Sequence, residues 1–586
     1  MASSYTPLPT SAHGIPLAPR ASTPKARRIF AAVGVALTLV GLFAAHRRYQ
    51  PDVERAPVQG YPVDSAALAC AHQDVAACDL SAIDLAQAPQ DLFRLAPVAA
   101  SVEAGTPLLL EIVATSNASA ECLLRSSIFA IGVSGPRIQR AHATNGGGSA
   151  LSLLSTVTMD EPGEYRIEAY LRLFNYPLAI CDASAARGEG RYVDQIVAGG
   201  NTTIVVLPTS TGAAPSAPER QCRYGELYDM RGAWLEPPVP ASIEGVFEKA
   251  RDCALEALPT PAEAFAQARA HGIRWLRFLG DSNTRNLYDS FPLVDPASSA
   301  LRNYRADPPY DLRATCGEAY DPPSRQQRNA RPTRKFCRVG LVDGDVQDDL
   351  VVSWEWFTPI HDPPLAAYFA DGDDGDGVDT KSPLWTDSTL GSVLGAPELD
   401  PRNSAATIES VLADRPDLLA LRGGDRVFLS YGSHAMMHTR DDVGRYVDEV
   451  ESAAERLAEL ESDDPESPQK RLSFALSTTK SCRKFSNATE ITPAMLRTCH
   501  SDNFRDKNLA ILREFAARRL SGPNGESLPA ASSSSTTTNR VPLDVLDFWH
   551  TTEAIEDYMT DKVHFGPGVY FVHSRAVATS WFADEV

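Results

Sequence analysis

The pattern of apolar and polar residues divides the chain into regions with different periodicities. Between residues 93 and 208, short segments alternate with a period of two, most clearly from Tyr165 to Arg172, where every second residue is apolar. Such a segment has one buried and one solvated face, as in a β-strand that covers a core. The runs 108–113 and 128–133 are similarly short and rich in aliphatic residues. Several strands at this spacing predict an immunoglobulin-like β-sandwich over residues 93–208.

From residue 261 onward, helical and strand periodicities alternate. Apolar residues recur at helical spacing in 261–271, 443–460 and 504–520, whereas the strand-like runs are 273–279, 350–356, 427–431, 472–476 and 541–546. Alternation of this kind predicts an α/β domain over 261–586, in which helices cover both faces of a parallel sheet. Residues 209–260, between the two regions, are expected to form a linker and a disulfide segment.

A third pattern is the uncharged apolar run 29–45, which basic residues bracket on both sides. Its length is at the short end of what spans a bilayer, and we interpret it as a transmembrane signal anchor. The alternative is a cleaved signal peptide, but the long polar leader 1–28 argues against it. The chain is then a single-pass type II protein with a cytoplasmic tail (1–28), a stem (46–92) and a lumenal body. A Golgi or other secretory-pathway membrane suits the short span.

The charge distribution narrows the range of partners. The chain of 586 residues has a formal net charge of −20, and residues 1–28 hold four cationic side chains and no acid. The body beyond the anchor is therefore even more acidic. Such a body repels phosphate backbones, which argues against nucleic acid as a partner. The acidic segment 371–379 lacks the ligand register and the closing Glu of a calcium loop, so we expect no metal site.

Cysteines and glycosylation sequons agree with a lumenal body. The chain has ten cysteines and no CxxC spacing, which favours disulfides over zinc. Proximity in sequence suggests the pairs Cys70–Cys78, Cys122–Cys181, Cys222–Cys253, Cys316–Cys337 and Cys482–Cys499, although ten cysteines permit many other connectivities. Asn117, Asn201 and Asn487 lie in N-x-S/T sequons on the predicted lumenal side.

The segment Gly280-Asp281-Ser282 carries the strongest chemical signal. It joins the predicted strand 273–279 to a helix, so Ser282 is expected at the carboxyl edge of the sheet, where open α/β folds bind ligands. There the backbone N–H of Ser282 would face an oxyanion. The tripeptide alone is weak, because a serine at this place is also an ordinary helix N-cap.

The motif Asp561-x-x-His564, near the carboxyl terminus, offers a base for this serine. A nucleophilic serine needs a base within hydrogen-bond reach, and the base needs an acceptor that orients it. Asp561 and His564 come from one turn of chain, so a single short segment can deliver both. The alternative for this pair alone is a surface carboxylate and a packed histidine. That alternative weakens when the pair is considered together with Ser282.

The two motifs together resemble the PC-esterase family. The matching pattern is Gly280-Asp281-Ser282-x-x-Arg285-Asn286, followed by Ser290 and, far downstream, by Asp561-x-x-His564. Segments 351–356 and 428–434 are similar to the family's aromatic strand and to its strand ending in Gly-x-His. The family includes plant trichome-birefringence-like proteins, capsule- and sialate-acetylating enzymes and NXPE proteins, and the upstream β-domain is similar to the NXPE arrangement. The resemblance covers about residues 220–586.

This resemblance implies an SGNH (GDSL-like) three-layer α/β/α fold whose Ser/Asp/His triad moves acetyl groups onto or off glycan hydroxyls. By this resemblance, Ser282 is the nucleophile, His564 the general base and Asp561 the residue that orients His564. Contacts to the substrate or the oxyanion are expected from Asp281, Arg285, Gly432 and His434. The block-III Asn of SGNH enzymes is not evident on the strand around Phe428, so the oxyanion hole stays unassigned.

The expected function is O-acetyl transfer to a glycan through an acetyl-Ser282 intermediate. No metal or organic cofactor is implied, and an acetyl donor such as acetyl-CoA is a substrate. A carbohydrate O-acetyl esterase, with water as acceptor, is the first alternative, because both reactions share the acyl-enzyme. The second alternative is a cell-surface binding protein with an inert esterase fold, which would require a broken triad.

Overall fold

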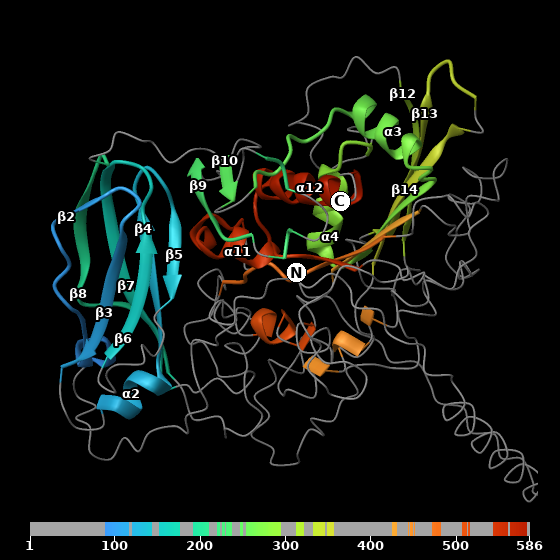
Figure 1. Cartoon of the computed structure of the whole chain (residues 1–586). Helices are drawn as coiled ribbons and strands as arrows, with labels where there is room; N and C mark the ends of the chain where they lie inside the picture. Colours follow the sequence, from blue (N-terminus) through green and yellow to red (C-terminus); the bar gives the residue numbers. More distant parts are fainter. Residues whose placement is uncertain are drawn as a thin grey trace, which may run out of the picture. The chain divides into compact units, whose positions relative to one another are not determined.

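A computed structural model shows the arrangement of the elements (Figure 1). The residues that it describes are 88–115, 120–142, 152–175, 191–209, 220–222, 226–228, 230–236, 246–249, 253–294, 312–320, 332–345, 348–356, 425–430, 443–444, 446–448, 450–451, 471–481, 507–512, 514–515, 543–560 and 563–582. The predicted tail 1–28, the anchor 29–45 and nearly all of the stem 46–92 lie outside these residues, as does the segment 371–379. Within the described residues, no helix has the length and apolar character needed to cross a membrane.

Strands occupy the region where the alternation of residues predicted them. In chain order the elements are η1 (Pro89–Leu92), β1 (Phe93–Leu95), β2 (Ser101–Glu103), β3 (Pro107–Ala114), α2 (Ala120–Ser126), β4 (Ile128–Ser134), β5 (Gln139–His142), β6 (Ser152–Thr158), β7 (Gly163–Phe174) and β8 (Arg191–Leu207). Among the described residues the pairing order is β5-β4-β7-β8-β1-β3-β6, and β2 adds to β8. We call this part the β-domain.

The core of the β-domain follows from the alternation along β7. Its residues Tyr165, Ile167 and Ala169 are fully buried, while the residues between them face outward or lie partly exposed. β7 pairs antiparallel with β4 on one side and with β8 on the other, so it is an inner strand of the sheet, and its apolar face packs into the hydrophobic cluster of the β-domain. Phe93 and Phe129 close the core with an edge-to-face contact of 4.9 Å between ring centroids.

The residues from 261 onward form a second layered part, the α/β domain. Its elements are α3 (Pro261–Ala270), β11 (Trp275–Gly280), α4 (Ser282–Ser290), β12 (Leu312–Tyr320), β13 (Pro332–Leu341), β14 (Leu350–Trp356), β15 (Arg426–Ser430), β16 (Arg471–Ala475), β17 (Leu543–Leu546), α11 (Phe548–Glu553), η6 (Glu556–Tyr558) and α12 (Pro567–Phe582). Among the described residues the sheet has seven strands in the order β12-β13-β14-β11-β15-β16-β17. The strands from β14 to β17 run parallel, as predicted.

Two strands at one edge of this sheet were not predicted. β12 and β13 pair antiparallel with each other, and β13 pairs antiparallel with β14, so the expectation of a wholly parallel sheet was wrong at this edge. The residues 312–341 carry many charged side chains and no continuous apolar run. An edge pair that is half solvated needs no such run, which is why the periodicity did not reveal it.

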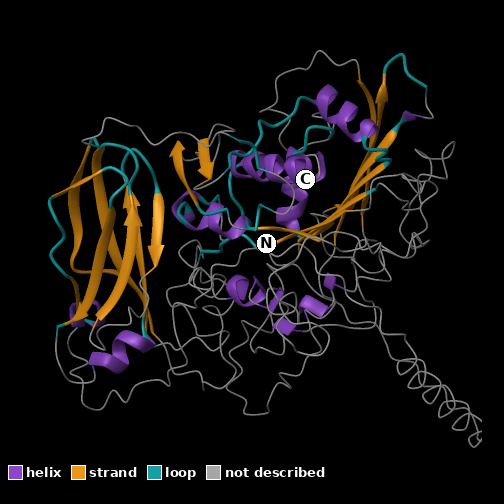
Figure 2. Cartoon of the chain, viewed as in Figure 1, coloured by secondary structure: helices purple, strands orange, loops and turns teal. Residues whose placement is uncertain are grey.

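Helical residues cover both faces of the parallel strands (Figure 2). Leu276 and Phe278 of β11 pack into one apolar cluster with α3, α4 and α12. Leu279, which points to the other face, packs with side chains from residues 443–450 and 510–515. Residues 443–444, 446–448, 450–451, 507–512 and 514–515 are helical, within the two predicted helices 443–460 and 504–520. Ser282 therefore lies where a strand buried on both faces ends.

The disulfides test part of the expected connectivity. Cys222 pairs with Cys253 and Cys316 with Cys337, with Cα separations of 4.8 Å and 4.1 Å, so these two predicted pairs are confirmed. Cys316 and Cys337 lie directly opposite each other in the β12–β13 ladder. Cys122 is also disulfide-bonded. The remaining predicted partners, namely Cys70, Cys78, Cys181, Cys482 and Cys499, lie outside the described residues.

The segment between the two parts is anchored to α11. β9 (Gly232–Glu236) and β10 (Val246–Lys249) form an antiparallel pair that follows Cys222. The fully buried Trp234 packs against Phe247 and donates its indole N–H to the Thr551 carbonyl at 2.7 Å. Part of the interval 209–260, which we expected to hold a linker and a disulfide segment, therefore also belongs to the core next to α11.

Candidate active site

The turn after β11 places Ser282 at the carboxyl end of the parallel strands. Gly280 ends the strand with φ of +156°, and a Cβ at this position would lie 1.9 Å from the Ser430 carbonyl oxygen of β15. The same carbonyl accepts hydrogen bonds from the Asp281 N–H at 3.4 Å and from the Thr284 hydroxyl at 2.8 Å. Close approach to β15 therefore requires glycine here, and it fixes the turn that presents Ser282.

Asp281 is the N-cap of α4. Its Oδ1 accepts from the N–H of Asn283 at 2.8 Å and of Thr284 at 3.4 Å, which is the usual arrangement of an aspartate that caps a helix. Ser282 follows as the first residue of the helix. Its hydroxyl is therefore left for other partners, and its own N–H is one of those that have no acceptor within the helix.

Ser282 and His564 meet although 282 residues separate them. The distance between Ser282 Oγ and His564 Nε2 is 2.6 Å, within the range of an O–H···N hydrogen bond at a catalytic serine. Ser282 is buried, with 6% of its surface exposed, and His564 is half-buried. For Nε2 to accept the serine proton, Nδ1 must carry the imidazole proton. Asp561, the expected partner of Nδ1, lies outside the described residues.

The backbone around His564 is held at two points. The His564 carbonyl accepts from the Thr560 N–H at 2.8 Å and from the Thr560 hydroxyl at 3.0 Å. On the other side, the Phe565 N–H donates to the Tyr570 hydroxyl at 3.4 Å. α12 starts two residues later at Pro567, whose fixed φ suits the first position of a helix. The imidazole is thereby delivered from a short segment tied to the start of a helix.

Tyr570 also reaches the helix that carries Ser282. Its hydroxyl donates to Asn283 Oδ1 at 2.8 Å and accepts from Asn286 Nδ2 at 3.2 Å. Sequence reasoning missed Tyr570, because a tyrosine in an apolar helix is ordinarily a core residue. Asn286 was part of the motif without an assigned role. The spacing of three residues between Asn283 and Asn286, about one helical turn, was the available signal for a shared partner.

Arg285 lies one turn after Ser282, near an aromatic ring of β14. Its guanidinium carbon is 6.0 Å from the centroid of the Trp354 ring, at the limit of a cation–π contact. Trp354 is fully buried, so it is a core residue and offers no platform for a sugar. No salt bridge to a described residue is formed by Arg285, which is half-buried. Gly432 and His434, the other expected contacts, lie outside the described residues.

A buried lysine that the sequence did not reveal lies near Asp281. Lys507 is 4% exposed. Burial, followed by the charge of Lys480, holds the pKa of Lys507 well below its usual range, and the carboxylate of Asp281 opposes this shift. Lys480 follows β16, two strands away from β11. The carboxyl ends of these strands therefore bring basic groups close to the turn that holds the nucleophile.

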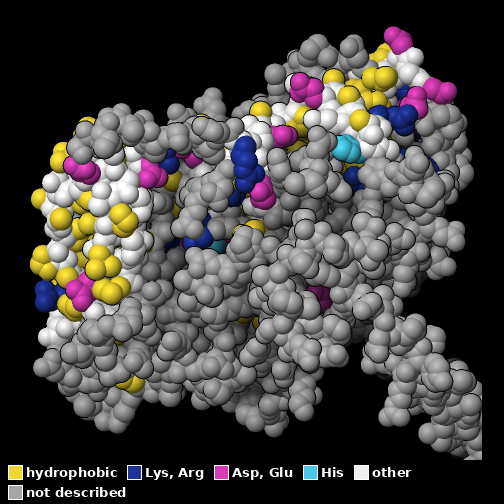
Figure 3. All heavy atoms as spheres, viewed as in Figure 1, with side chains coloured by type: hydrophobic (Ala, Val, Ile, Leu, Met, Phe, Trp, Pro, Cys, Tyr) yellow, Lys and Arg dark blue, Asp and Glu magenta, His cyan; other side chains and the backbone are white. Residues whose placement is uncertain are grey.

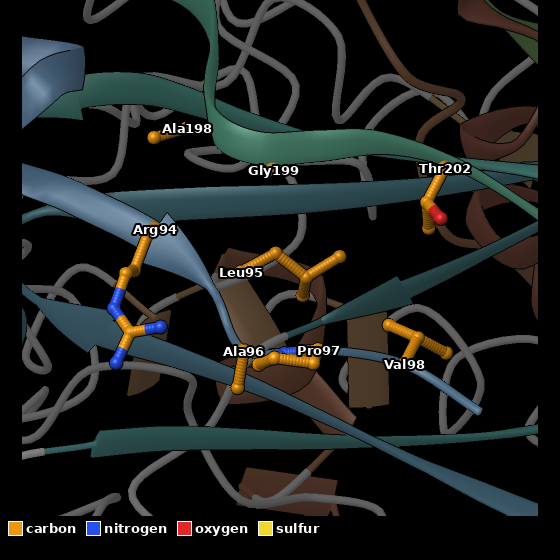
Figure 4. A pocket seen from close by; sticks show the side chains of 8 residues that line it. All are labelled: Arg94, Leu95, Ala96, Pro97, Val98, Ala198, Gly199 and Thr202. Carbon is orange, nitrogen blue, oxygen red and sulfur yellow. The ribbon is translucent and has the colours of Figure 1, made fainter.

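Other candidate sites lie in the β-domain. A groove with a volume of about 280 Å³ is lined by residues of β1 and β8, among them Arg94, Leu95 and Thr202 (Figure 4). It contains none of the predicted catalytic residues.

Asn201, in one of the sequons, is exposed on β8 and accepts a hydrogen bond from Arg166. Asn117 and Asn487 lie outside the described residues.

Apolar side chains on the surface of the β-domain do not mark a site by themselves. Figure 3 shows them scattered between polar and charged groups on the face that it draws. Leu109 is 58% exposed, and Val205 and Leu207 are exposed to a smaller extent. Scattered exposed hydrophobic residues are normal for a soluble surface, so the hydrogen-bonded Ser282–His564 pair remains the strongest candidate.

Comparison with known proteins does not establish a family. No family model matches the chain, and no curated protein matches it. Among solved structures, a protein from Bacteroides vulgatus ATCC 8482 described as a candidate glycoside hydrolase is similar at 10% identity and a TM-score of 0.14. The match covers 71% of this chain and 54% of that protein, so the chain spans about half of its length. Similarity at this level carries no argument about fold or function.

Proposed function

We propose that this chain is a serine-dependent O-acetyltransferase that acts on glycan hydroxyls. The observation that carries the proposal is the 2.6 Å hydrogen bond between Ser282 Oγ and His564 Nε2, formed between two motifs at opposite ends of the α/β domain. A serine at the end of a parallel strand with an imidazole on its hydroxyl is the arrangement that nucleophilic catalysis needs. The resemblance of both motifs to the PC-esterase family supports an SGNH-like fold and acetyl groups as the cargo.

In the first half of the reaction, His564 Nε2 takes the Ser282 proton while Oγ attacks the acetyl carbonyl carbon of the donor. The bond between that carbon and the leaving group of the donor breaks, and the leaving group departs with the proton from His564. The developing oxyanion is stabilised by an N–H group at the start of α4. Asp281 already accepts from the N–H groups of Asn283 and Thr284, so the Ser282 N–H is the donor that we assign.

In the second half, a glycan hydroxyl gives its proton to His564 and attacks the acetyl carbon. The Ser282 ester bond breaks, and Oγ regains the proton from His564. Asp561 accepts from Nδ1 and stabilises the imidazolium that forms in each half. Water in place of the glycan would make the protein an esterase, because the acyl-enzyme is common to both reactions.

We place this reaction on the lumenal side of a secretory-pathway membrane, in a single-pass type II protein anchored by residues 29–45. Disulfides at Cys222–Cys253 and Cys316–Cys337 support an oxidising compartment, because such bonds are rare where thiols are kept reduced. Asn201 is exposed and so available to glycosylation.

The proposal is tested with the full chain in detergent, an isotope-labelled acetyl donor (acetyl-CoA or p-nitrophenyl acetate) and a panel of glycans. The wild-type protein is expected to carry a labelled acetyl group on the peptide that contains Ser282 and to pass it to a glycan. Ser282→Ala should lower turnover by about 10³-fold or more, with His564→Ala nearly as damaging and the double variant little worse. Asp561→Asn should be milder, because it misorients the imidazole without removing it.

Ser290→Ala is the matched control. Ser290 is buried in the same helix and donates to the Asn286 carbonyl at 2.8 Å, so this variant also loses one serine hydroxyl from α4 and should keep most of the turnover. Loss of label to water in the presence of every glycan would favour the esterase. Turnover that survives Ser282→Ala would show that Ser282 is not the nucleophile.

A further inference from the structure

The hydroxyl of Tyr570 connects the two chain segments that carry the reacting groups. It donates to Asn283 Oδ1 at 2.8 Å, and it accepts from the Phe565 N–H at 3.4 Å and from Asn286 Nδ2 at 3.2 Å. Asn283 is the residue after Ser282, and Phe565 is the residue after His564. The Tyr570 hydroxyl is thus hydrogen-bonded to the residue that follows Ser282 and to the residue that follows His564.

The ring that carries this oxygen is fixed in place. Tyr570 is 2% exposed and lies in the apolar cluster formed by α4, α12 and β11. Its ring meets the buried ring of His573 edge to face, with 6.2 Å between centroids. A phenol held in this way loses little further freedom when it forms hydrogen bonds, so its oxygen is a rigid reference point for the groups around it.

We infer that Tyr570 is a positioning residue that sets the separation of Ser282 and His564. The inference rests on the proposed function, because it concerns the geometry of the same reaction. α4 and the described residues 563–565 have no covalent connection near the site, so their relative position depends on contacts of this kind. Loss of the hydroxyl lets the His564 segment shift away from α4, and a misplacement of about 1 Å is enough to cost about 100-fold in rate.

A purely structural role makes a different prediction. If the hydroxyl only satisfies buried polar groups, its loss lowers stability and leaves the reactivity of the folded protein unchanged. If it positions the pair, the chemical step slows while binding of a small reagent, which touches neither Asn283 nor Phe565, stays the same. The two roles are separated by measuring the rate of the chemical step and the binding step independently.

The experiment compares Tyr570→Phe with the full-length wild-type protein, using a fluorophosphonate probe. In this reaction Ser282 Oγ forms a bond to phosphorus, fluoride leaves, and His564 accepts the serine proton. The maximal inactivation rate is expected to fall about 10- to 100-fold, and the probe concentration at half-maximal rate is expected to change less than twofold. Rates are measured well below the melting temperature of the variant, so that only folded protein is compared.

Tyr288→Phe is the matched control. Tyr288 lies in α4, is 1% exposed and belongs to the same apolar cluster, and its hydroxyl lies 3.5 Å from Cys337 Sγ of β13. This variant loses one buried phenol oxygen from the same core and should keep the wild-type inactivation rate. An inactivation rate of Tyr570→Phe equal to that of wild type would overturn the inference.

Two further variants keep the outcomes distinguishable. If Tyr570→Phe does not fold, Asn283→Ala removes the acceptor on the Ser282 side and should slow inactivation similarly, whereas a wild-type rate for it would contradict the inference. Ser282→Ala tests the proposed function itself. Labelling that persists in Ser282→Ala, or a wild type that the probe does not label, would reject the proposed function rather than the role of Tyr570.

Discussion

In the turn after β11, Asp281 caps helix α4 and the next residue, Ser282, bonds to His564. The sequence left open whether Ser282 is a nucleophile or an ordinary helix N-cap. In the structure the cap is Asp281, whose carboxylate accepts from two N–H groups of the first turn of α4. Asp281 therefore has a capping role in the described geometry, and its expected contact with substrate or oxyanion stays a prediction. The Ser282 hydroxyl is left to bond with His564.

His573 of α12 is a buried histidine that affects how stability depends on pH. Its ring is stacked on Phe548 with 3.9 Å between centroids, and its Nε2 lies 2.8 Å from the Thr551 hydroxyl. That hydroxyl donates to the Phe548 carbonyl at 2.8 Å, so it accepts from Nε2–H, and the neutral Nε2–H tautomer fits. Burial lowers the pKa of His573 to about 3.

This pKa predicts that acid destabilises the α/β domain. The unfolded histidine has a pKa near 6.5, so above about pH 6.5 both states are neutral and the contribution of His573 to stability is complete. As pH falls from about 6.5 to 3, His573 is protonated in the unfolded chain but stays neutral in the folded chain. The free energy of unfolding therefore declines by up to about 1.4 kcal/mol per pH unit. Urea denaturation between pH 7 and 4 measures this slope.

His573→Phe is the comparison for this slope. It keeps a ring that can stack on Phe548, and the Thr551 hydroxyl keeps its bond to the Phe548 carbonyl. The free energy of unfolding of this variant should fall less steeply with acid than that of the wild type. Identical slopes for the two proteins would mean that the titration of His573 does not contribute.

At the scale of elements, the strand–turn–helix unit of β11 and α4 determines the position of Ser282. Arg277 of β11 pairs with Glu355 of β14 through two hydrogen bonds of 2.7 and 3.0 Å. Lys335 of β13 pairs with Asp289 of α4 at 3.0 Å. These buried pairs tie the unit to its neighbours, and Gly280 allows it to approach β15. Its position is therefore determined from several sides.

Gly280→Ala should damage both stability and reactivity. The methyl group would lie 1.9 Å from a backbone oxygen of Ser430 and 2.3 Å from Thr284 Oγ1, and the φ of +156° disfavours any side chain. Backbone strain of this kind costs about 1–3 kcal/mol before the clash is included. We expect a lower free energy of unfolding and little phosphonylation of Ser282, measured by urea denaturation and by probe labelling.

Gly132→Ala in β4 controls for the added methyl group. There the nearest atom would be the Glu168 carbonyl oxygen at 3.9 Å, an ordinary contact. Stability should change by less than about 1 kcal/mol, with normal labelling. If Gly280→Ala behaved like Gly132→Ala, the turn would tolerate a side chain and the close approach to β15 would not be essential.

At the scale of the whole molecule, a buried ion cluster joins residues far apart in sequence. The Glu556 carboxylate of η6 accepts from Arg140 at 3.1 Å and pairs with Arg172 of β7, which also pairs with Asp194 of β8. The side chains of Arg172 and Glu556 are 4% and 7% exposed. η6 lies immediately before the segment that carries His564. The β-domain thus contributes charge to the support of that segment.

Glu556→Gln should be strongly destabilising. The substitution removes a carboxylate charge that two largely buried arginines share, and breaking a buried ion pair by removing one partner typically costs about 3–5 kcal/mol. The free energy of unfolding from urea denaturation gives the measurement. The control is Asp348→Asn, which breaks the pair with Arg269, where the side chains are 38% and 51% exposed; a change of less than about 1 kcal/mol is expected there. Equal effects of the two substitutions would argue against a supporting role for the cluster.

Much of the local structure could be read from the sequence. The alternation around Tyr165, the strand before Gly280 and the pairing of Cys222 with Cys253 were all predicted, and each appears in the structure. The physical reason is that periodicity reports which face of an element is buried. Cysteines that are close in sequence also have little loop entropy to overcome when they pair.

The tertiary structure alone decided those contacts between segments that no sequence motif had indicated. The two motifs predicted that Ser282 and His564 would meet, and the structure adds the 2.6 Å geometry of that contact. The bond of Tyr570 to Asn283, which no motif indicated, depends on how α12 packs against α4. The antiparallel edge strands β12 and β13 and the cluster at Glu556 are of the same kind. The contacts at Tyr570 and at Glu556 join segments hundreds of residues apart, and their free energy, which comes from packing and hydrogen bonding, exists only when the domain has formed. β12 and β13 are close in sequence, but their residues have no apolar periodicity that would report the pairing.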